Sequence, residues 1–370
     1  MRYFLYGYYG HGNFGDDLLL HALISGIQQR DCAAEFVVKS HGQVSGLAHL
    51  PNIHFSETDR VFESESGRLV KGVRHLVALL RQVNNADVFV IGGGSLFIDK
   101  GRCNFSLLFL WCAARFAKLR HRRVIITGVG FDILSNSFSL WLSRGIVASA
   151  DFVAIRDAVS LSYLDHLPVP NIRLAADLIF ADTTIVPANR EGAGRKRKVI
   201  GICLIDYFRT VDISAIKHEA YLNRVTELLR QNQDRFDFCC LAFQEGVGQR
   251  DEWMYQKLKG QFPTLSYKHI ALRADLEFLR DEIDLVITTR FHLGLLACML
   301  GKPVAIISHE LKLAALALDF ALPTIFMEEF VEGQGLELVE MLERFDCQEL
   351  TGKLDRQRVR ARRNFDWLIR

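Results

Sequence analysis

Short apolar runs alternate with longer amphipathic segments from the start of the chain to about residue 187. The runs at 3–8, 34–39, 87–91, 124–127, 152–155 and 172–175 have the length and the β-branched or aromatic content of buried strands. Helical periodicity occupies 16–27, 68–82, 104–119 and 138–149. This alternation predicts a doubly wound, parallel α/β sheet for the first half of the chain.

A polar, basic and glycine-containing segment at 188–198 interrupts the pattern, and a second alternating unit follows it. Strands are predicted at 199–204, 236–243, 285–288 and 304–307, and helices at 217–229, 293–300 and 312–321. We therefore expect two Rossmann-like domains, 1–187 and 199–335, joined by the 188–198 linker and facing each other across a cleft, which is a GT-B-like α/β architecture. Residues 336–370 are expected to form helices that pack back on the N-terminal domain.

Arg290 and His292 come directly after the strand predicted at 285–288, and a helix follows them. Open α/β sheets bind ligands outside the carboxyl ends of their strands, where the next helix offers unpaired N–H groups to an anion. A guanidinium and an imidazole two residues apart at this place predict an anion site with a proton donor. The structural alternative is an arginine that binds a carbonyl and a histidine packed against the next loop.

Two glycine-rich segments are predicted to follow strands in the first half. The segment 7–17 contains four glycines but lacks the Lys-Ser/Thr of a Walker loop. A dinucleotide site requires an acidic residue at the end of a second strand about 20 residues on, where Lys39 and Ser40 stand instead. Its Asp16 is predicted either to cap the next helix or to bind a sugar hydroxyl. The three glycines at 92–94 predict close approach by a ligand or a facing domain, with a tight strand-to-helix turn as the alternative.

Composition and charge indicate a globular protein without a nucleic-acid-binding surplus of charge or a cysteine framework. With 370 residues and 49% hydrophobic positions the chain can bury a large core, and a net charge of +2 gives no general attraction to nucleic acid. The eight cysteines form no Cys-x-x-Cys pair, so neither a zinc nor a disulfide framework is expected. Because the chain begins directly with a strand and its most apolar window is too short to span a bilayer, we expect a cytoplasmic protein.

Four motifs, taken in order, carry a family likeness. They are Gly7-Tyr8-Tyr9-Gly10-x-Gly-Asn13-x-Gly15-Asp16, the glycines at 92–94, Ile155-Arg156-Asp157-x-x-Ser160, and Arg290-Phe291-His292 with Gly301-x-Pro303. Over about residues 1–320 the chain resembles the polysaccharide pyruvyl transferase family, above all its cell-wall and exopolysaccharide ketal pyruvyltransferases. The resemblance implies a GT-B-like enzyme that transfers pyruvate from phosphoenolpyruvate to two hydroxyls of one sugar, in a cell-surface polysaccharide or its precursor, and releases phosphate.

The resemblance also implies roles for residues by position. The catalytic residues would be His292 and Arg156, the donor-binding residues Arg290, Arg156, Lys312, Gly93 and Gly94, and the acceptor-binding residues Asn13 and Asp16. These types suit the reaction, because phosphoenolpyruvate carries a phosphate and a carboxylate that need several cations. A histidine suits proton delivery to the methylene carbon. No cofactor and no metal are expected, since phosphoenolpyruvate is a substrate, side chains supply the cations and the chain has no Asp-x-Asp.

Two other functions stay open from the residues. A metal-independent GT-B glycosyltransferase would use a nucleotide sugar, and a non-catalytic sugar- or nucleotide-binding module would need the glycine segments but not His292.

The C-terminal segment stands apart in charge. The last 20 residues carry a net +5 and the other 350 a net −3. In the helix predicted there, Leu354, Ala361 and Phe365 fall near one face, while Arg356, Arg360 and Arg363 line another. One reading is that the apolar face packs on the N-terminal domain and the arginines are solvated. The other is that the arginines lie on anionic lipid at the inner membrane face and bring the enzyme to a lipid-linked oligosaccharide acceptor.

Overall fold

The computed structural model describes residues 1–42, 44, 46–47, 49–56, 68–99, 104–132, 134–164, 172–187, 197–245 and 250–368, with the side chains of 68 and 69 left out. The chain forms two compact units. Unit 1 comprises Met1–His11, Asp16–Asp182 and Gln357–Arg370, and unit 2 comprises Gly12–Gly15 and Thr183–Arg356.

Unit 1 is built on a seven-stranded parallel sheet in the order β3-β2-β1-β4-β5-β6-β7. Its strands are β1 (Arg2–Tyr9), β2 (Glu35–Ser40), β3 (Ile53–Ser56), β4 (Val88–Phe97), β5 (Arg123–Phe131), β6 (Phe152–Ile155) and β7 (Ile172–Leu174). Its helices are α1 (Phe14–Gln28), α2 (Arg68–Asn85), α3 (Phe105–Leu119), α4 (Ser137–Ala148), α5 (Ala158–Ser162), the 3₁₀ turn η2 (Leu178–Ala181), the end of α14 (Gln348–Arg362) and η4 (Arg363–Leu368).

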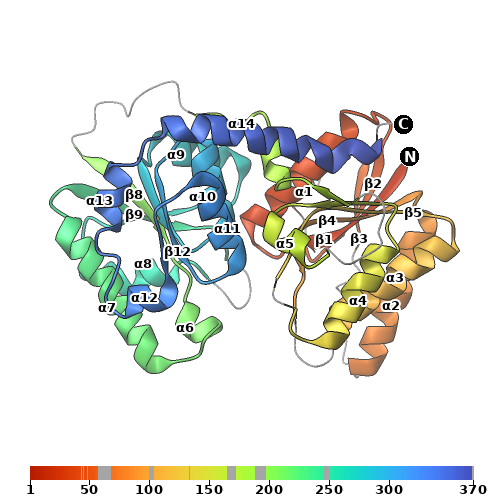
Figure 1. Ribbon diagram of the computed structural model, residues 1–370, viewed down its shortest axis with the longest axis horizontal. Coiled ribbons are helices and arrows are strands. Elements are labelled where there is room, and N and C mark those ends of the chain that lie inside the picture. Colours follow the sequence, from red (N-terminus) through yellow and green to blue (C-terminus); the bar gives the residue numbers. More distant parts are fainter. Residues whose placement is uncertain are drawn as a thin grey trace. The chain divides into compact units, whose positions relative to one another are not determined.

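Helices cover both faces of this sheet, as expected for a parallel sheet with buried strands. Figure 1 shows α2, α3 and α4 on one face and α1 with the end of α14 on the other. On the second face, Phe365 lies against Gly26 of α1, where an added Cβ would be 2.2 Å from the ring. Between α2–α4 and the sheet lies a core that includes Phe89, Val124 and Ile146.

Unit 2 holds a six-stranded parallel sheet in the order β10-β9-β8-β11-β12-β13. Its strands are β8 (Lys198–Cys203), β9 (Phe236–Ala242), β10 (Ser266–His269), β11 (Leu285–Thr288), β12 (Val304–Ser308) and β13 (Thr324–Phe326). Its helices are α6 (Tyr207–Thr210), α7 (Ala215–Asn232), α8 (Trp253–Leu258), η3 (Arg273–Asp275), α9 (Leu276–Asp281), α10 (Phe291–Met299), α11 (Leu311–Phe320), α12 (Met327–Val331), α13 (Leu338–Glu343) and the start of α14.

The predicted fold class of two parallel, doubly wound α/β units is therefore confirmed. Each sheet reverses its strand order once, between β1 and β4 in unit 1 and between β8 and β11 in unit 2. Sheets of this kind bind ligands at the carboxyl ends of the strands beside the reversal. The first glycine segment follows β1, and the Arg290-x-His292 pair follows β11, so each occupies such an end.

The glycines at 92–94 lie inside β4, so the alternative of a strand-to-helix turn there is wrong. Gly93 and Gly94 have φ of +73° and +79°, which non-glycine residues avoid. Helix α1 also packs directly on them, because a Cβ added to Gly92 would lie 2.8 Å from Leu23 and one added to Gly93 would lie 3.0 Å from Leu19. Contact between helix and strand thus explains the bare backbone without a ligand.

The chain beyond 335 is shared between the units. Residues up to Arg356 belong to unit 2, and Gln357–Arg370 belong to unit 1. From the sequence, all of 336–370 was expected to form helices that pack on the N-terminal domain. Most of the predicted linker, 188–196, lies outside the described residues.

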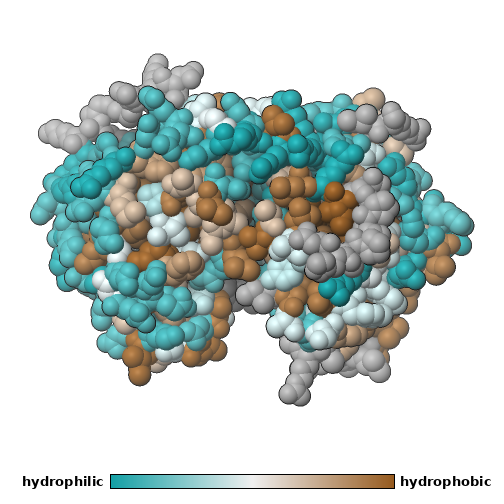
Figure 2. All heavy atoms as spheres, viewed as in Figure 1, coloured by the Kyte–Doolittle hydropathy of each residue, from teal (hydrophilic) through white to brown (hydrophobic). Residues whose placement is uncertain are grey.

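The end of α14 and η4 are held in unit 1 by polar contacts as well as by Phe365. Asn364 donates to the carbonyl of Ala176 at 2.8 Å and accepts a hydrogen bond from Thr127 at 3.1 Å. The side of α14 turned away from the sheets is hydrophilic (Figure 2). Among the helices of the described residues, none combines the length and the apolarity needed to cross a bilayer.

Candidate functional site

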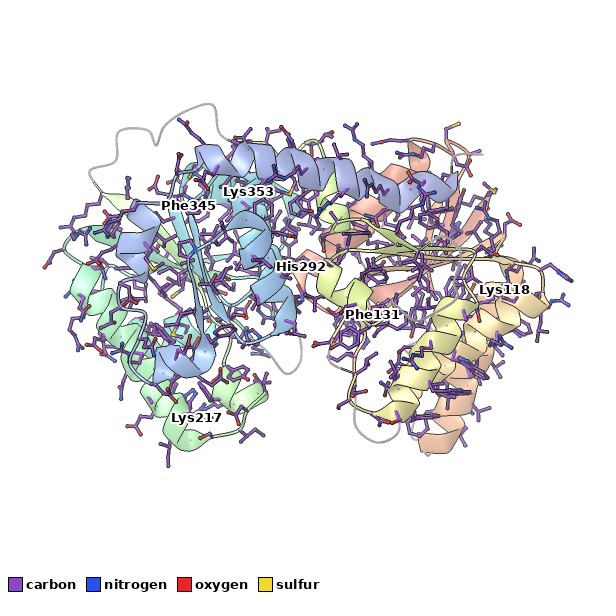
Figure 3. The ribbon with its side chains drawn as sticks, in the orientation of Figure 1. Lys118, Phe131, Lys217, His292, Phe345 and Lys353 are labelled. Atoms are coloured by element: carbon purple, nitrogen blue, oxygen red, sulfur yellow. The ribbon has the colours of Figure 1, made fainter. Side chains whose placement is uncertain are left out.

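Arg290 and His292 lie where the sequence predicted, at the end of β11 and the start of α10 (Figure 3). Arg290 is the N-cap residue of α10, with extended backbone, and its N–H donates to Thr288 Oγ1 at 2.8 Å. Every residue of α10 after His292 is buried, so the helix is fixed on the sheet while His292 keeps part of its surface exposed. The imidazole is therefore presented from a rigid support at a helix N-terminus, which favours a nearby anion.

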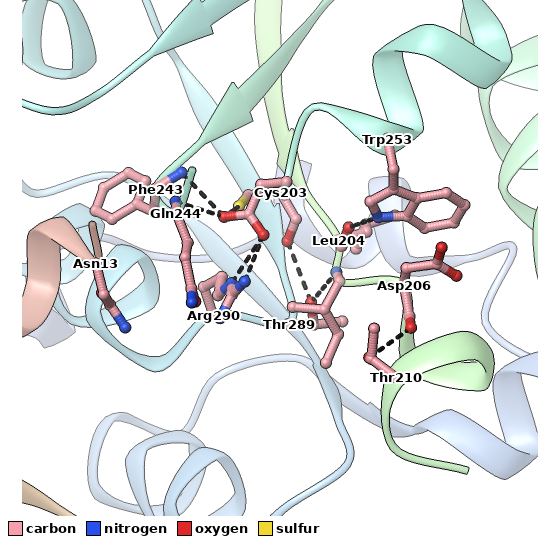
Figure 4. A network of polar contacts seen from close by, with 12 residues as sticks. Asn13, Cys203, Leu204, Asp206, Thr210, Phe243, Gln244, Trp253, Thr289 and Arg290 are labelled. Carbon is pink, nitrogen blue, oxygen red and sulfur yellow. Dashed lines mark hydrogen bonds and ion pairs between the residues drawn. The ribbon is translucent and has the colours of Figure 1, made fainter. Parts of the chain in front are cut away.

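Asp251 holds the side chain of Arg290. One carboxylate oxygen, Oδ1, lies 3.1 Å from Nε and 2.5 Å from Nη2 of the guanidinium (Figure 4). The Asp251 side chain is 1% exposed and that of Arg290 16%. Burial by itself would lower the pKa of Arg290, but the neighbouring Asp251 carboxylate more than offsets this and raises it. The arginine is permanently charged and fixed in direction.

The other oxygen of Asp251 joins the ends of β8 and β9 to this pair. Oδ2 accepts hydrogen bonds from the N–H groups of Phe243 and Gln244, both at 3.0 Å, and from the Cys203 thiol at 3.6 Å. Burial and the Asp251 charge raise the pKa of the Cys203 thiol, so that it stays protonated and can donate. The carboxylate is thereby satisfied on both oxygens, as a buried charge requires.

Asp251 was not predicted from the sequence. The residue belongs to no motif and follows residues 246–249, which lie outside the described part of the chain. Only its role as the partner of Arg290 in space identifies it.

The turn Gly12–Gly15 belongs to unit 2 by its contacts, although α1 continues from it into unit 1. Phe14 N–H donates to the Phe243 carbonyl at 3.1 Å, and Glu245 N–H donates to the Gly12 carbonyl at 3.2 Å. Asn13 and Gln244 form an isolated antiparallel bridge between these bonds. The turn of the first glycine motif is thus hydrogen-bonded to the residues after β9, where Asp251 also binds Phe243 and Gln244.

Gly15 touches the imidazole of His292. A Cβ built on Gly15 would lie only 2.1 Å from Nδ1 and 2.3 Å from Cγ of that ring. The side-chain oxygen of Asn13 accepts the Gly15 N–H at 3.1 Å and so fixes the turn. Two motifs more than 270 residues apart in the sequence therefore meet at His292. Nothing in the sequence predicted this contact.

Lys312 and His309 lie at the end of β12, the strand beside β11. Lys312 Nζ forms an ion pair with Glu310 at 2.9 Å, and His309 Nε2 lies 3.7 Å from the same carboxylate. The ring of His309 also packs 5.1 Å from that of Tyr207. Arg290 and Lys312 are thus both paired with a carboxylate, so the local charge is near zero when the histidines are neutral.

Arg156 lies in unit 1, at the end of β6, and its side chain is 3% exposed. Its guanidinium is 3.3 Å from Asp157, 3.8 Å from Asp177 and 3.0 Å from the Ser95 hydroxyl. Gly130 makes room for it, since a Cβ there would lie 2.5 Å from Nε. Burial raises the pKa of Asp177 to about 6 despite the nearby Arg156. Two carboxylates therefore share this cation within unit 1.

The remaining predicted positions are also in unit 1. Asp16 Oδ1 would lie 3.4 Å from a Cβ on Gly94, which places the carboxylate beside β4. Asp17 accepts the Gly10 N–H at 2.9 Å, as a residue that shapes the turn, and burial raises the pKa of its carboxyl to about 6. Within the described residues, no group of three or more His, Cys, Asp or Glu side chains is arranged to hold a metal ion.

Comparison with known proteins adds a family and a fold. A family model described as polysaccharide pyruvyl transferase matches residues 13–310. A comparison with curated proteins finds no match. Among solved structures, a putative UDP-N-acetylglucosamine 2-epimerase from Listeria monocytogenes is similar at 12% identity and a TM-score of 0.62, covering 98% of this chain and 92% of its own. MurG from Acinetobacter baumannii is similar at 14% identity and 0.54, covering 99% and 98%. The UDP-GlcNAc 2-epimerase from Neisseria meningitidis, at 10% and 0.60, covers 100% and 99%. These likenesses confirm a GT-B-like fold.

Proposed function

Because the chain belongs to the polysaccharide pyruvyl transferase family, we propose that it transfers pyruvate from phosphoenolpyruvate to two hydroxyls of one sugar in a cell-surface polysaccharide or its precursor. The product is a cyclic ketal and the leaving group is phosphate. The observation that carries this proposal is the pair at the end of β11. A charged, immobilised Arg290 stands two residues before a partly exposed His292 at the start of α10.

The reaction requires two additions at one carbon. In the first, a sugar hydroxyl bonds to C2 of phosphoenolpyruvate while its methylene carbon, C3, takes up a proton and becomes a methyl group. In the second, the neighbouring hydroxyl bonds to C2 and the C2–O bond to phosphate breaks. One proton enters at C3 and one leaves each hydroxyl, and the phosphate departs with the remaining proton, so the balance closes.

His292 is the proposed proton donor to C3. General acid catalysis by a positioned histidine is worth about 10² to 10⁴ in rate. Its place at a helix N-terminus suits a donor that carries phosphate and carboxylate groups. Gly15 and the turn fixed by Asn13 hold the ring from one side. We propose that this contact orients the His292 ring for proton transfer to C3.

Arg290 and Lys312 are proposed to bind the anionic groups of the donor. Asp251 and Glu310 hold these cations in place and balance their charge before the donor arrives. Because the cations are already neutralised, the donor is proposed to bind through directed hydrogen bonds. These come from the edge of the Arg290 guanidinium that Asp251 does not contact and from the N–H groups at the starts of α10 and α11. Arg156, in unit 1, is a further proposed donor-binding residue, on the family resemblance.

The acceptor is proposed to contact Asp16 and Asn13. Asp16 can accept hydrogen bonds from sugar hydroxyls. Asn13 uses its side-chain oxygen on Gly15, so its amide NH₂ is the group it would offer the sugar.

The test is to incubate the protein with phosphoenolpyruvate and a panel of free and lipid-linked oligosaccharides, and to follow the acceptor mass. A parallel series supplies nucleotide sugars in place of phosphoenolpyruvate. Gain of a pyruvyl ketal with the first donor supports the proposal. Transfer of a sugar from a nucleotide sugar, with no ketal formed, overturns it.

A further inference from the structure

The outer face of α2, α3 and α4 exposes large apolar side chains to solvent. Phe105 is 61% exposed, Trp141 56% and Phe138 40%, and Val73 and Val77 are each 55% exposed. Single exposed apolar residues are normal, but a group that includes three aromatic rings on adjacent helices marks an interaction site.

Ring contacts link side chains of neighbouring helices in two groups. Phe105 and Phe109 lie 6.3 Å apart along α3, and Phe109 lies 5.6 Å from His75 of α2. A Cβ on Gly72 of α2 would lie 3.5 Å from the same phenylalanine. On the other side of α3, the ring of Trp111 lies 5.4 Å from that of Trp141 of α4. Phe138 in turn lies 6.1 Å from Trp141. We refer to the exposed side of α2, α3 and α4 as the α2–α4 face.

The charges on these three helices have one sign. Their side chains include six basic residues, counting only those that the structure describes, and no acidic residue: Lys71, Arg74, Arg81, Arg115, Lys118 and Arg144. Lys118, labelled in Figure 3, pairs with Asp151 at 2.5 Å in a partly exposed contact. Basic and apolar side chains are thus interspersed on the α2–α4 face. Brown spheres lie among teal ones over this region, at the lower right of Figure 2.

We propose that the α2–α4 face binds the surface of an anionic lipid bilayer. Tryptophan and phenylalanine favour the boundary between head groups and acyl chains, and neighbouring Lys and Arg are attracted to anionic head groups. A second copy of the chain fits less well, because a two-fold contact would bring two basic surfaces together. A soluble polyanion would leave the aromatic rings without a partner. The proposal goes beyond the reaction and does not depend on it.

Helix α14 is a weaker candidate for the same partner. Ala361 and Phe365, the apolar residues near the end of this segment, are 0% and 1% exposed in unit 1, so they cannot enter a bilayer beside the arginines. Arg363 donates to the Leu174 carbonyl at 3.1 Å. The end of α14 also lies on the face of the unit 1 sheet opposite to α2–α4 (Figure 1). One flat membrane therefore cannot contact both surfaces.

The experiment is co-sedimentation of the full chain with vesicles of phosphatidylglycerol and phosphatidylethanolamine, and with vesicles of phosphatidylcholine alone. We expect binding at least ten-fold stronger to the anionic vesicles, weakening as salt is added. The variant Phe105→Ser/Phe138→Ser/Trp141→Ser and the variant Arg74→Gln/Arg81→Gln/Arg144→Gln should each weaken it at least ten-fold. Circular dichroism and the Tm of each variant check that it folds.

Matched control variants distinguish binding by the α2–α4 face from non-specific binding of exposed apolar or basic residues. Ile213 and Ile216 in unit 2 are each 84% exposed, so Ile213→Ser/Ile216→Ser removes highly exposed apolar side chains elsewhere. Arg356→Gln/Arg360→Gln removes charge from α14. Neither control should change binding.

Tryptophan fluorescence gives a second measurement, because Trp141 should enter the head-group region and be quenched by brominated lipid, and Trp141→Phe should reduce that quenching. Four results would each overturn the proposal. They are equal binding to neutral vesicles, no binding at all, equal loss in the controls, and a dimer in solution that the α2–α4 substitutions dissociate.

Discussion

Replacing Gly15 with alanine tests the contact that joins the first glycine motif to His292. The new Cβ would lie 2.1 Å from Nδ1, whereas ordinary contact begins near 3.4 Å, so the ring must move by about 1.3 Å. A displacement of about 1 Å in a catalytic group costs on the order of 10² in rate. Gly15→Ala should therefore lower kcat about 100-fold. Stability should change little, since alanine is the better residue in a helix by about 1 kcal/mol.

Steady-state kinetics with phosphoenolpyruvate and the identified acceptor measure this effect. Gly352→Ala is the matched control, because a Cβ at this helical position meets nothing within 4 Å. If Gly15 acts through His292, the double variant Gly15→Ala/His292→Ala should be about as slow as His292→Ala alone. A folded Gly15→Ala enzyme with wild-type kcat would refute the reasoning. Effects that multiply in the double variant would show that Gly15 acts elsewhere.

Two further predictions concern buried charges and stability, and a third concerns the need for a metal. Asp251→Asn keeps an acceptor for Phe243 and Gln244 but leaves Arg290 buried without its counter-charge, so urea denaturation should show a loss of about 3 kcal/mol. Lys118→Gln breaks a partly exposed ion pair and should lower the free energy of unfolding by less than about 1 kcal/mol. Equal losses of stability in Asp251→Asn and Lys118→Gln would contradict this prediction. The pKa of Asp17 is about 6 in the folded protein against 3.8 ordinarily, so the folded state holds the proton more tightly and stability should fall as pH rises from about 4 to 6. Asp17→Asn should therefore be more stable than wild type at pH 7, by about 1–3 kcal/mol, with the difference closing below pH 4; an equal difference at both pH values would contradict this. Pyruvyl transfer should continue in excess EDTA, and activity lost to the chelator and restored by magnesium or manganese would disprove the prediction of a metal-independent reaction.

The alternation of apolar runs and helical periods was enough to predict both sheets. The sequence placed β11 at the residues where it is found and the next helix within two residues of its observed start. Such agreement is expected for strands buried on both faces, whose continuous apolar runs are bounded by polar residues. Shorter or more polar strands, such as β3 and β10, were missed because their residues carry little apolar signal.

What the sequence could not supply were the contacts between distant segments. The glycines at 92–94 suggested a turn or a ligand, yet the packing of Leu19 and Leu23 explains them. Asp251 was missed because a buried carboxylate is recognisable only beside the cation that compensates it. For the C-terminal helix the sequence predicted either that the arginines are solvated or that they lie on anionic lipid. The structure shows the apolar residues Ala361 and Phe365 buried in unit 1, which is compatible with both readings of the arginines.

The most direct test of the central claim compares wild-type protein and His292→Ala in the same reaction, with phosphate and ketal quantified together. We predict that wild type forms one phosphate for each pyruvyl ketal on the sugar. His292→Ala should remain folded and form both products about 10² to 10⁴ times more slowly. Phosphate release without a ketal, or near-normal turnover by folded His292→Ala, would contradict the account.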